Sequence, residues 1–456
     1  MQTDRLQAEL ELCARLEASA GSVIERLRLV ALLAPDLASA DRELAEHAVR
    51  RARELSALLA TGLESASSAY ERLEDGLEAA GRRLAAQLAG WAGLAMRTGA
   101  GVGVLVLVGT PVLLGAVAGW LVAGQLRPES GSPLDWLVQN PGVITNPTFA
   151  RMIELVVTSS DDFALAALGV PPEVSALLGE DALALTGVAA GATLLLAATG
   201  PLGIARESPV GVTREATRPG WEGAPAGSVD RLARVPDGGA QLRIERYDSP
   251  GQSPRWIVYV GPTYDFVVTG AQPFDMTSNL HAVAGLSPAS LRALDLAMVD
   301  AGVATSDEVQ FVGFSQGGII AARAASSGNW NAVGLETFGS PLGTIEIPDG
   351  VTGIAVRHTD DFVPSTGGPD LADDDVLRVE RRAYLAEDAL PSIPAPAHQR
   401  ASYLETAAEV DAARSEALTA RNEELTAFAA DYLESGGDLT VYEYRAIRLP
   451  VDPPGA

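Results

Sequence analysis

The chain has 456 residues, 47% of them apolar, so it can hold two or three domains with buried cores, and wholesale disorder is excluded. Its formal net charge of −26 excludes a nucleic-acid-binding protein, because binding to phosphate backbones needs a basic surface stripe and the sequence has none. The one cysteine, Cys13, excludes an intramolecular disulfide and a cysteine-based metal site. The start of the chain, Met1–Arg5, lacks the basic and short apolar segments of a secretory signal, so we do not expect Sec export.

Residues 1–98 are rich in Leu, Ala, Glu and Arg, and their leucines recur at helical spacing. Leu55, Leu59 and Leu63 show this spacing, and it is interrupted once, at Ala34–Asp36. The pattern predicts two or three amphipathic helices in a hairpin or bundle. The simplest interpretation of such a module is packing without chemistry.

Residues 99–205 contain two long apolar segments, Gly99–Gln125 and Ala182–Ala205, neither of which carries a charge. Each exceeds 20 residues, enough at ~1.5 Å per residue to cross a hydrocarbon core of ~30 Å. Each also has a Gly-xxx-Gly pair, which lets two membrane helices approach closely. The sequence therefore predicts a pair of membrane-associated helices, with buried soluble helices as the alternative.

Arginines flank these two segments and are sparse between them. The connection has only Arg127 and Arg151, whereas three arginines precede the first segment and three follow the second: Arg82, Arg83, Arg97, Arg206, Arg214 and Arg218. Because basic residues favour the cytoplasmic side, we expect a membrane-associated protein with both termini in the cytoplasm.

Residues 206–231 are rich in Pro, Gly and Thr and are predicted to be a linker. Residues 232–456 then alternate short β-rich segments with helical ones. The predicted elements are Trp256–Val260, Ser287–Ala301, Val309–Val312, Gly317–Ser326, Ala332–Thr337 and Val351–Arg357, then helix within Gln399–Glu434 and a strand at Leu439–Ile447. This alternation predicts an α/β domain, a mostly parallel sheet flanked by helices.

A G-x-S-x-G pentapeptide, Gly313–Gly317, lies between the predicted strand and helix at the centre of this domain. A sharp strand-to-helix turn exposes the central serine, and the N-terminus of the helix favours negative charge above it. Ser315 is therefore the candidate nucleophile. The alternative is a purely structural turn.

A serine hydroxyl needs a base to take its proton and an acid to orient that base. Of the four histidines, His47 lies in the N-terminal module, His281 precedes the serine, and His358 ends a strand where the acid is expected. His398 is thus the candidate base, with an exposed loop histidine as the alternative. Asp360 and Asp361 both follow that strand; we favour Asp361 as the acid and keep Asp360 open.

An oxyanion site needs two backbone N–H donors. One is expected from Gln316, directly after the nucleophile. The second should come from the loop after Trp256–Val260, and because Pro262 has no N–H, Thr263 is favoured, with Tyr264 as the alternative.

Residues 255–409 resemble the actinobacterial α/β-hydrolases related to class 3 lipases and cutinases. The matching pieces are Val258–Phe266, Pro273–Leu280, Gly313–Gly318, Phe338–Pro341, Asp361–Pro364, and His398 with Tyr403. The resemblance implies an α/β-hydrolase fold, hydrolysis of carboxylic esters or lipids without metal or cofactor, and Asp361 as the acid of a D-x-V-P motif. The absence of lysine, which is typical of a GC-rich coding bias, fits an actinobacterial source.

The N-terminal module resembles the WXG-type modules of type VII secretion, through Trp91–Gly93 and Tyr70–Glu74. This resemblance implies a small helical protein partner and export by a type VII system. Two rival functions therefore stay open beside a membrane-associated esterase. One is a secreted effector with a lipase-like domain, and the other is a catalytically idle scaffold with a hydrolase fold.

Overall fold

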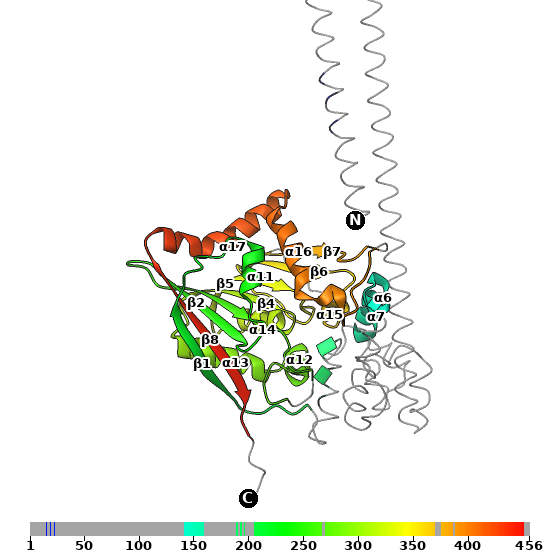
Figure 1. Cartoon of the computed structure of the whole chain (residues 1–456), viewed down its shortest axis with the longest axis horizontal. Helices are drawn as coiled ribbons and strands as arrows, with labels where there is room; N and C mark the ends of the chain where they lie inside the picture. The colour runs from blue at the N-terminus through cyan, green and yellow to red at the C-terminus, as the bar shows by residue number, and fades with distance from the viewer. Residues whose placement is uncertain are drawn as a thin grey trace, which may run out of the picture. The chain divides into compact units, whose positions relative to one another are not determined.

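The computed structural model describes residues 141–158, 205–266, 270–369, 375–385 and 388–450, with Arg15, Ser19, Ser22, Val188, Ala189, Ala192, Thr193 and Leu196. The chain divides into two compact units, Met1–Arg83 and Leu84–Ala456. In the first unit only Arg15, Ser19 and Ser22 are described, all helical, so the predicted helical module lies outside the described residues. The elements named below belong to the second unit (Figure 1).

The predicted apolar helices also lie largely outside the described residues. Gly99–Gln125 is wholly outside, and Ala182–Ala205 is described only at Val188, Ala189, Ala192, Thr193, Leu196 and Ala205. Among the residues that the structure does describe, no helix is both long and apolar enough to cross a membrane.

One mixed sheet of eight strands forms the centre of the described part, in the order β1-β8-β2-β3-β4-β5-β6-β7. Neighbours from β3 to β7 are parallel, and β1, β8, β2 and β3 pair antiparallel. The strands are β1 (Val210–Pro219), β2 (Leu242–Asp248), β3 (Arg255–Val260), β4 (Glu308–Phe314), β5 (Asn331–Phe338), β6 (Thr352–His358), β7 (Val376–Arg381) and β8 (Asp438–Arg448). The predicted sheet flanked by helices is confirmed, with an antiparallel end that the sequence did not predict.

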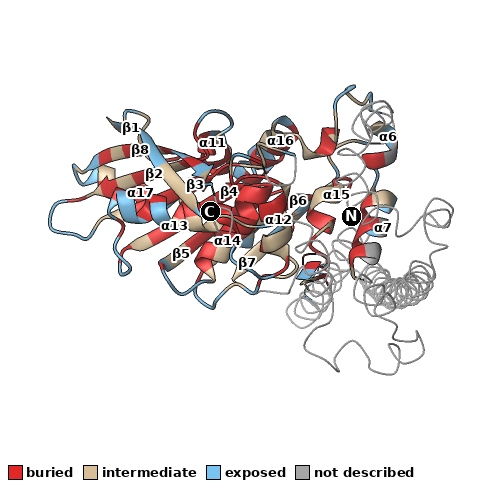
Figure 2. Ribbon diagram, turned by 90° about the horizontal axis from the view of Figure 1, so that it is seen from below, coloured by how far each residue is buried: buried red, intermediate tan, exposed pale blue. Residues whose placement is uncertain are grey.

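Helices cover both faces of this sheet (Figure 1). One face packs against α12 (Met276–Val283), α13 (Ala289–Ala301) and α14 (Gln316–Ala325), and the other against α11 (Ser228–Arg234), α16 (Arg400–Asp411) and α17 (Glu416–Glu434). Because β3 is covered on both sides, its side chains are apolar without alternation, and Trp256–Val260 are all fully buried. Figure 2 shows buried residues concentrated in these strands and the helices against them.

The segment 206–231, predicted to be a linker, is instead part of the fold. Val210–Pro219 forms the edge strand β1, whose residues pair antiparallel with β8 from Val210↔Arg448 to Pro219↔Thr440. This strand was not predicted because an edge strand with no buried residue needs no alternation of apolar and polar side chains. Its pairing comes from a strand more than 200 residues away in the chain.

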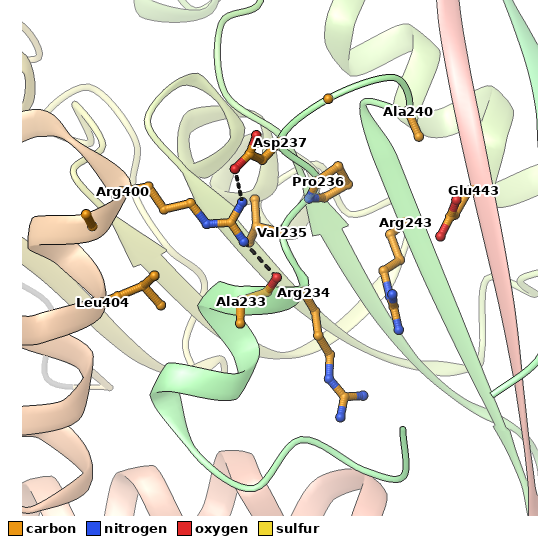
Figure 3. A pocket seen from close by; sticks show the side chains of 12 residues that line it. Ala233, Arg234, Val235, Pro236, Asp237, Ala240, Arg243, Arg400, Leu404 and Glu443 are labelled. Atoms are coloured by element: carbon orange, nitrogen blue, oxygen red, sulfur yellow. Dashed lines mark hydrogen bonds and ion pairs between the residues drawn. The ribbon is translucent and has the colours of Figure 1, made fainter. Parts of the chain in front are cut away.

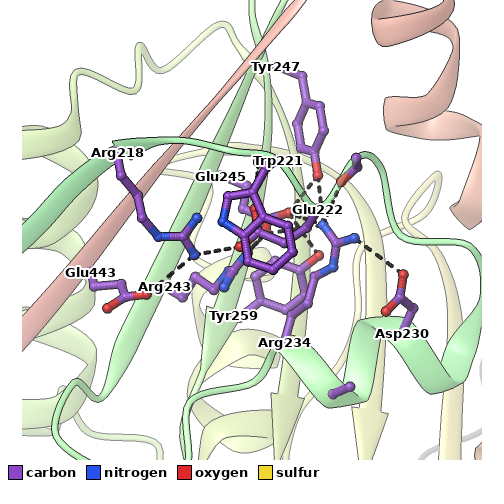
Figure 4. A network of polar contacts seen from close by, with 12 residues as sticks. Arg218, Trp221, Glu222, Asp230, Arg234, Arg243, Glu245, Tyr247, Tyr259 and Glu443 are labelled. Carbon is purple, nitrogen blue, oxygen red and sulfur yellow. Dashed lines mark hydrogen bonds and ion pairs between the residues drawn. The ribbon is translucent and has the colours of Figure 1, made fainter.

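The end of the supposed linker is fixed by buried charges on α11. Arg231 and Glu336 of β5 form an ion pair with both side chains fully buried, and Ser228 donates to the same carboxylate at 2.7 Å. Arg234 reaches Glu245 of β2 at 3.0 Å within a larger polar network (Figure 4). Removing one partner would leave the other charge buried and unpaired, which typically costs about 3–5 kcal/mol, so these pairs specify where α11 docks on the sheet.

Candidate active site

Ser315 lies in the sharp turn between β4 and α14, at the carboxyl end of the parallel strands. Its backbone has φ 55° and ψ −123°, a conformation that non-glycine residues seldom adopt. The Ser315 N–H donates to the carbonyl of Phe338 on β5 at 2.8 Å, which fixes the turn against the neighbouring strand. Such strain, of order 1–3 kcal/mol, persists only where the surrounding structure enforces it.

The glycines of the motif are required by close backbone contacts. A Cβ on Gly313 would lie 2.3 Å from the carbonyl oxygen of Gly317, and a Cβ on Gly317 would lie 2.0 Å from that of Val260. A Cβ on Gly318 would lie 1.9 Å from the Ser340 hydroxyl oxygen. Gly313 and Gly317 are therefore required by the tightness of the turn and by its packing against β3, and Gly318, directly after the pattern, by the close approach of Ser340.

The structure brings Ser315, His398 and Asp361 together in one chain of hydrogen bonds. His398, in the short 3-10 helix η2 (Pro396–His398), places Nε2 at 2.9 Å from the Ser315 Oγ. Its Nδ1 lies 2.6 Å from Oδ2 of Asp361. The Asp361 side chain is fully buried, whereas 16% of the His398 side chain is exposed.

This geometry also assigns the imidazole tautomer. Because the ionised carboxylate can only accept, Nδ1 carries the proton, and the neutral ring leaves the Nε2 lone pair to accept from the serine hydroxyl. The ring of Phe314 stacks on that of His398, with centroids 5.3 Å apart. A histidine held in this way is able to take the Ser315 proton.

The structure distinguishes the two adjacent aspartates. Asp361 is the N-cap of α15 (Phe362–Ser365), and its Oδ1 accepts from the Val363 N–H at 3.0 Å while Oδ2 faces His398. Asp360 points elsewhere: its two oxygens accept from the backbone N–H groups of Ala383 and Tyr384, at 2.8 and 2.9 Å. Asp360 thus holds the loop after β7, and Asp361 alone reaches the imidazole.

The two predicted oxyanion donors come from adjacent parts of the fold. Gln316 begins α14, where the first N–H groups of a helix have no intrahelical acceptor. Thr263 lies in the loop after β3, whose Val260 and Gly261 carbonyls contact Gly317. The N–H of the alternative, Tyr264, donates to the Phe274 carbonyl at 2.9 Å and is not free for a substrate.

Helix α12 and its N-cap bind the side chains of both donor residues, Gln316 and Thr263, an arrangement that the sequence did not predict. The Gln316 side chain donates to the Asp275 carbonyl at 3.1 Å, and Asn279 donates to the Thr263 hydroxyl at 3.0 Å. Asp275 caps α12 and is held by Arg448 of β8 at 2.9 Å. In the sequence, the segment Pro273–Leu280 was one of the pieces that resemble the α/β-hydrolases, but the resemblance gave it no role at the oxyanion site.

Two stacked aromatic residues, His358 and Tyr403, lie next to the triad. His358 is buried, and burial lowers its pKa, so the ring is neutral at pH 7. Its Nδ1 lies 2.7 Å from the carbonyl oxygen of Ala397, the residue before His398. His358 is therefore not a base for Ser315 but a support of the loop that carries His398.

Part of the predicted apolar region packs beside this site. Helix α7 (Pro147–Thr158) contacts α15, and the Phe149 and Phe362 rings meet edge to face at 5.9 Å. Ile153, Val157 and Val188 form a small core there with Phe362. Phe362 directly follows Asp361, so residues N-terminal to the sheet contribute an apolar wall close to the triad.

An open pocket of about 650 Å³ lies between the end of α11, the start of β2 and the start of α16 (Figure 3). Arg234, Arg243 and Arg400 line it, and no triad residue does. Each of these arginines already has a carboxylate partner, and Arg400 pairs with Asp237 at 3.2 Å. The pocket therefore offers no unpaired cation for an anionic ligand.

Comparisons of the chain with protein-family models, curated proteins and solved structures found no match. Within the part of the chain that the structure describes, no cluster of His, Cys, Asp or Glu has the arrangement of a metal site. The functional interpretation therefore rests on the geometry of the site itself.

Proposed function

We propose that the part of the chain around the mixed sheet is an α/β-hydrolase-type serine hydrolase that cleaves carboxylic esters through an acyl-enzyme. The observation that carries this proposal is the hydrogen-bonded chain Asp361–His398–Ser315, with separations of 2.6 and 2.9 Å, on a strained strand-to-helix turn. A nucleophile, its base and the orienting acid in mutual contact are what acyl transfer requires.

In this mechanism the Ser315 Oγ attacks the ester carbonyl carbon while His398 Nε2 takes its proton. The N–H groups of Gln316 and Thr263 stabilise the oxyanion of the tetrahedral intermediate. When the intermediate collapses, the alcohol leaves with the proton from His398. Water then attacks the acyl-enzyme with His398 as base, which releases the acid and restores Ser315.

The surroundings of the triad favour an apolar acyl group. Phe314 stacks on the catalytic imidazole, and the partly exposed rings of Phe149 and Phe362 meet beside Asp361. Burying a methylene group against such side chains contributes about 0.8 kcal/mol. We therefore propose esters of fatty acids, including lipids, as the substrate class.

A partitioning experiment on the full chain tests the acyl-enzyme. The protein is given p-nitrophenyl butyrate or phenyl butyrate in buffer with added methanol, and butyric acid and methyl butyrate are measured. We expect the same ratio of the two products from both esters, because both pass through one butyryl-enzyme that water and methanol share. A ratio that follows the leaving group would contradict the acyl-enzyme, and no turnover above buffer would favour the idle scaffold.

A further inference from the structure

The acid of the triad accepts a hydrogen bond from a buried side chain that the mechanism above does not use. The hydroxyl of Tyr403, on α16, donates to Oδ2 of Asp361 at 2.8 Å. This is the same oxygen that accepts the Nδ1 proton of His398 at 2.6 Å. Two donors therefore share one carboxylate oxygen. The negative charge that Tyr403 draws toward its own hydrogen bond weakens the hydrogen bond from that oxygen to the imidazole.

The position of the Tyr403 hydroxyl is fixed on every side. The ring is fully buried and stacks on His358, with centroids 3.8 Å apart and planes 13° from parallel. The His358 backbone N–H donates to the Tyr403 oxygen at 3.2 Å. On the other side Gly339 has φ +61°, and a Cβ there would lie 2.9 Å from the ring. These contacts hold the ring of Tyr403 in place and keep its phenol oxygen within hydrogen-bond distance of Asp361.

Tyr403 also remains a donor throughout the working pH range. Burial and the neighbouring Asp361 carboxylate raise the pKa of the Tyr403 phenol well above its usual value of 10.0. A phenol that stays protonated between pH 5 and 9 donates constantly, so its effect on Asp361 does not vary with pH over that range.

We propose that Tyr403 is a positioning residue that holds the Asp361 carboxylate and lowers the basicity of His398. A carboxylate oxygen that already accepts from Tyr403 stabilises the imidazolium less than one that accepts from His398 alone. The histidine consequently gives up its proton at lower pH, which keeps it competent as a base near neutrality. The kinetic consequence rests on the proposed hydrolase function, whereas the effect on the basicity of His398 does not.

The other titratable and charged groups in this part of the structure have partners other than His398. Asp360 accepts two backbone N–H groups of the loop after β7, and His358 is neutral. Arg381 donates to the Thr406 hydroxyl at 2.9 Å, and Arg400 pairs with Asp237. Among the groups described here, Asp361 is the one charge in hydrogen-bond contact with the imidazole, so a change at Tyr403 acts through it.

The test is the pKa of His398 measured by ¹⁵N NMR of histidine-labelled full chain, with the signal assigned by a His398→Gln variant. In Tyr403→Phe we expect that pKa to rise by about half a unit or more, because Oδ2 of Asp361 then accepts from the imidazole alone. Tyr432→Phe is the matched control: it also removes a phenol hydroxyl, one that donates to the Ser253 carbonyl at 2.9 Å, and should leave the pKa unchanged. Because no substrate is involved, the measurement stands whether or not esters are cleaved.

A second variant covers the case in which Tyr403→Phe does not fold. Incorporation of 3-fluorotyrosine at position 403 keeps the ring and strengthens the donor, so the His398 pKa should fall. If the protein is a hydrolase, the acid limb of kcat/KM should move with the NMR value in both variants, with kcat for Tyr403→Phe reduced about tenfold and KM unchanged. A His398 pKa that is unchanged, or that moves in the same direction in both variants, overturns the proposal.

Discussion

Ser315→Ala should lower kcat for ester hydrolysis by about 10⁶-fold, because the hydroxyl oxygen that lies 2.9 Å from His398 Nε2 is lost. Alanine accepts the φ of 55° at this position about as well as serine, and the N–H of residue 315 still donates to Phe338. The turn should therefore keep its structure, and KM for the ester should change little. The rates are measured with p-nitrophenyl butyrate.

The matched control for this variant is Ser326→Ala at the other end of α14. The Ser326 hydroxyl donates to the Glu346 carbonyl at 2.8 Å and touches no triad residue. It should hydrolyse the ester at the wild-type rate, and both variants should unfold at nearly the wild-type temperature. Activity of Ser315→Ala within tenfold of wild type would mean that another group carries out the reaction.

Asp361→Asn should lower kcat by about 10⁴-fold, because the amide cannot both accept from Nδ1 and stabilise the imidazolium. The amide group would also favour the wrong tautomer of His398, with its proton on Nε2. The loss should appear in kcat and kcat/KM alike, since no contact with bound ester changes. Steady-state kinetics on the full chain measure it.

Asp360→Asn is the neighbouring control, with a different expected result. Its carboxylate accepts from Ala383 and Tyr384, and an asparagine can satisfy only one of these N–H groups. We expect a loss of about 1–3 kcal/mol in the free energy of unfolding and a kcat within about tenfold of wild type. If Asp360→Asn were the nearly inactive variant and Asp361→Asn the active one, the assignment of the acid would be wrong.

The arrangement of the triad in the chain was predictable because its signals are local. Ser315 lies in a pentapeptide whose glycines are demanded by contacts within a few ångströms, and His398 was the one histidine left after position was considered. The choice between Asp360 and Asp361 depended on which direction each side chain takes after β6. Adjacent residues differ in that direction, and composition carries no information on it.

The rest of the fold depended on contacts between distant residues. Strand β1 is ordered by β8, and β2 by β3 and β8, so neither needed a strong pattern of its own. The roles of Tyr403 and His358 likewise come from groups 42 and 39 residues away, the Asp361 carboxylate and the Ala397 backbone carbonyl. A tyrosine in a helix and a histidine at the end of a strand carry no sign of these roles in the sequence, because the contacts form only when α16 packs against β6.

The most direct test of a nucleophilic Ser315 is the site at which a fluorophosphonate attaches to the folded full chain. The reagent phosphonylates a serine only where a base activates it, and peptide mass spectrometry locates the adduct. We expect one adduct per chain, on the peptide that contains Ser315, and none in Ser315→Ala or in protein unfolded beforehand. An adduct on any other serine, or none on the folded wild-type chain, would contradict the account.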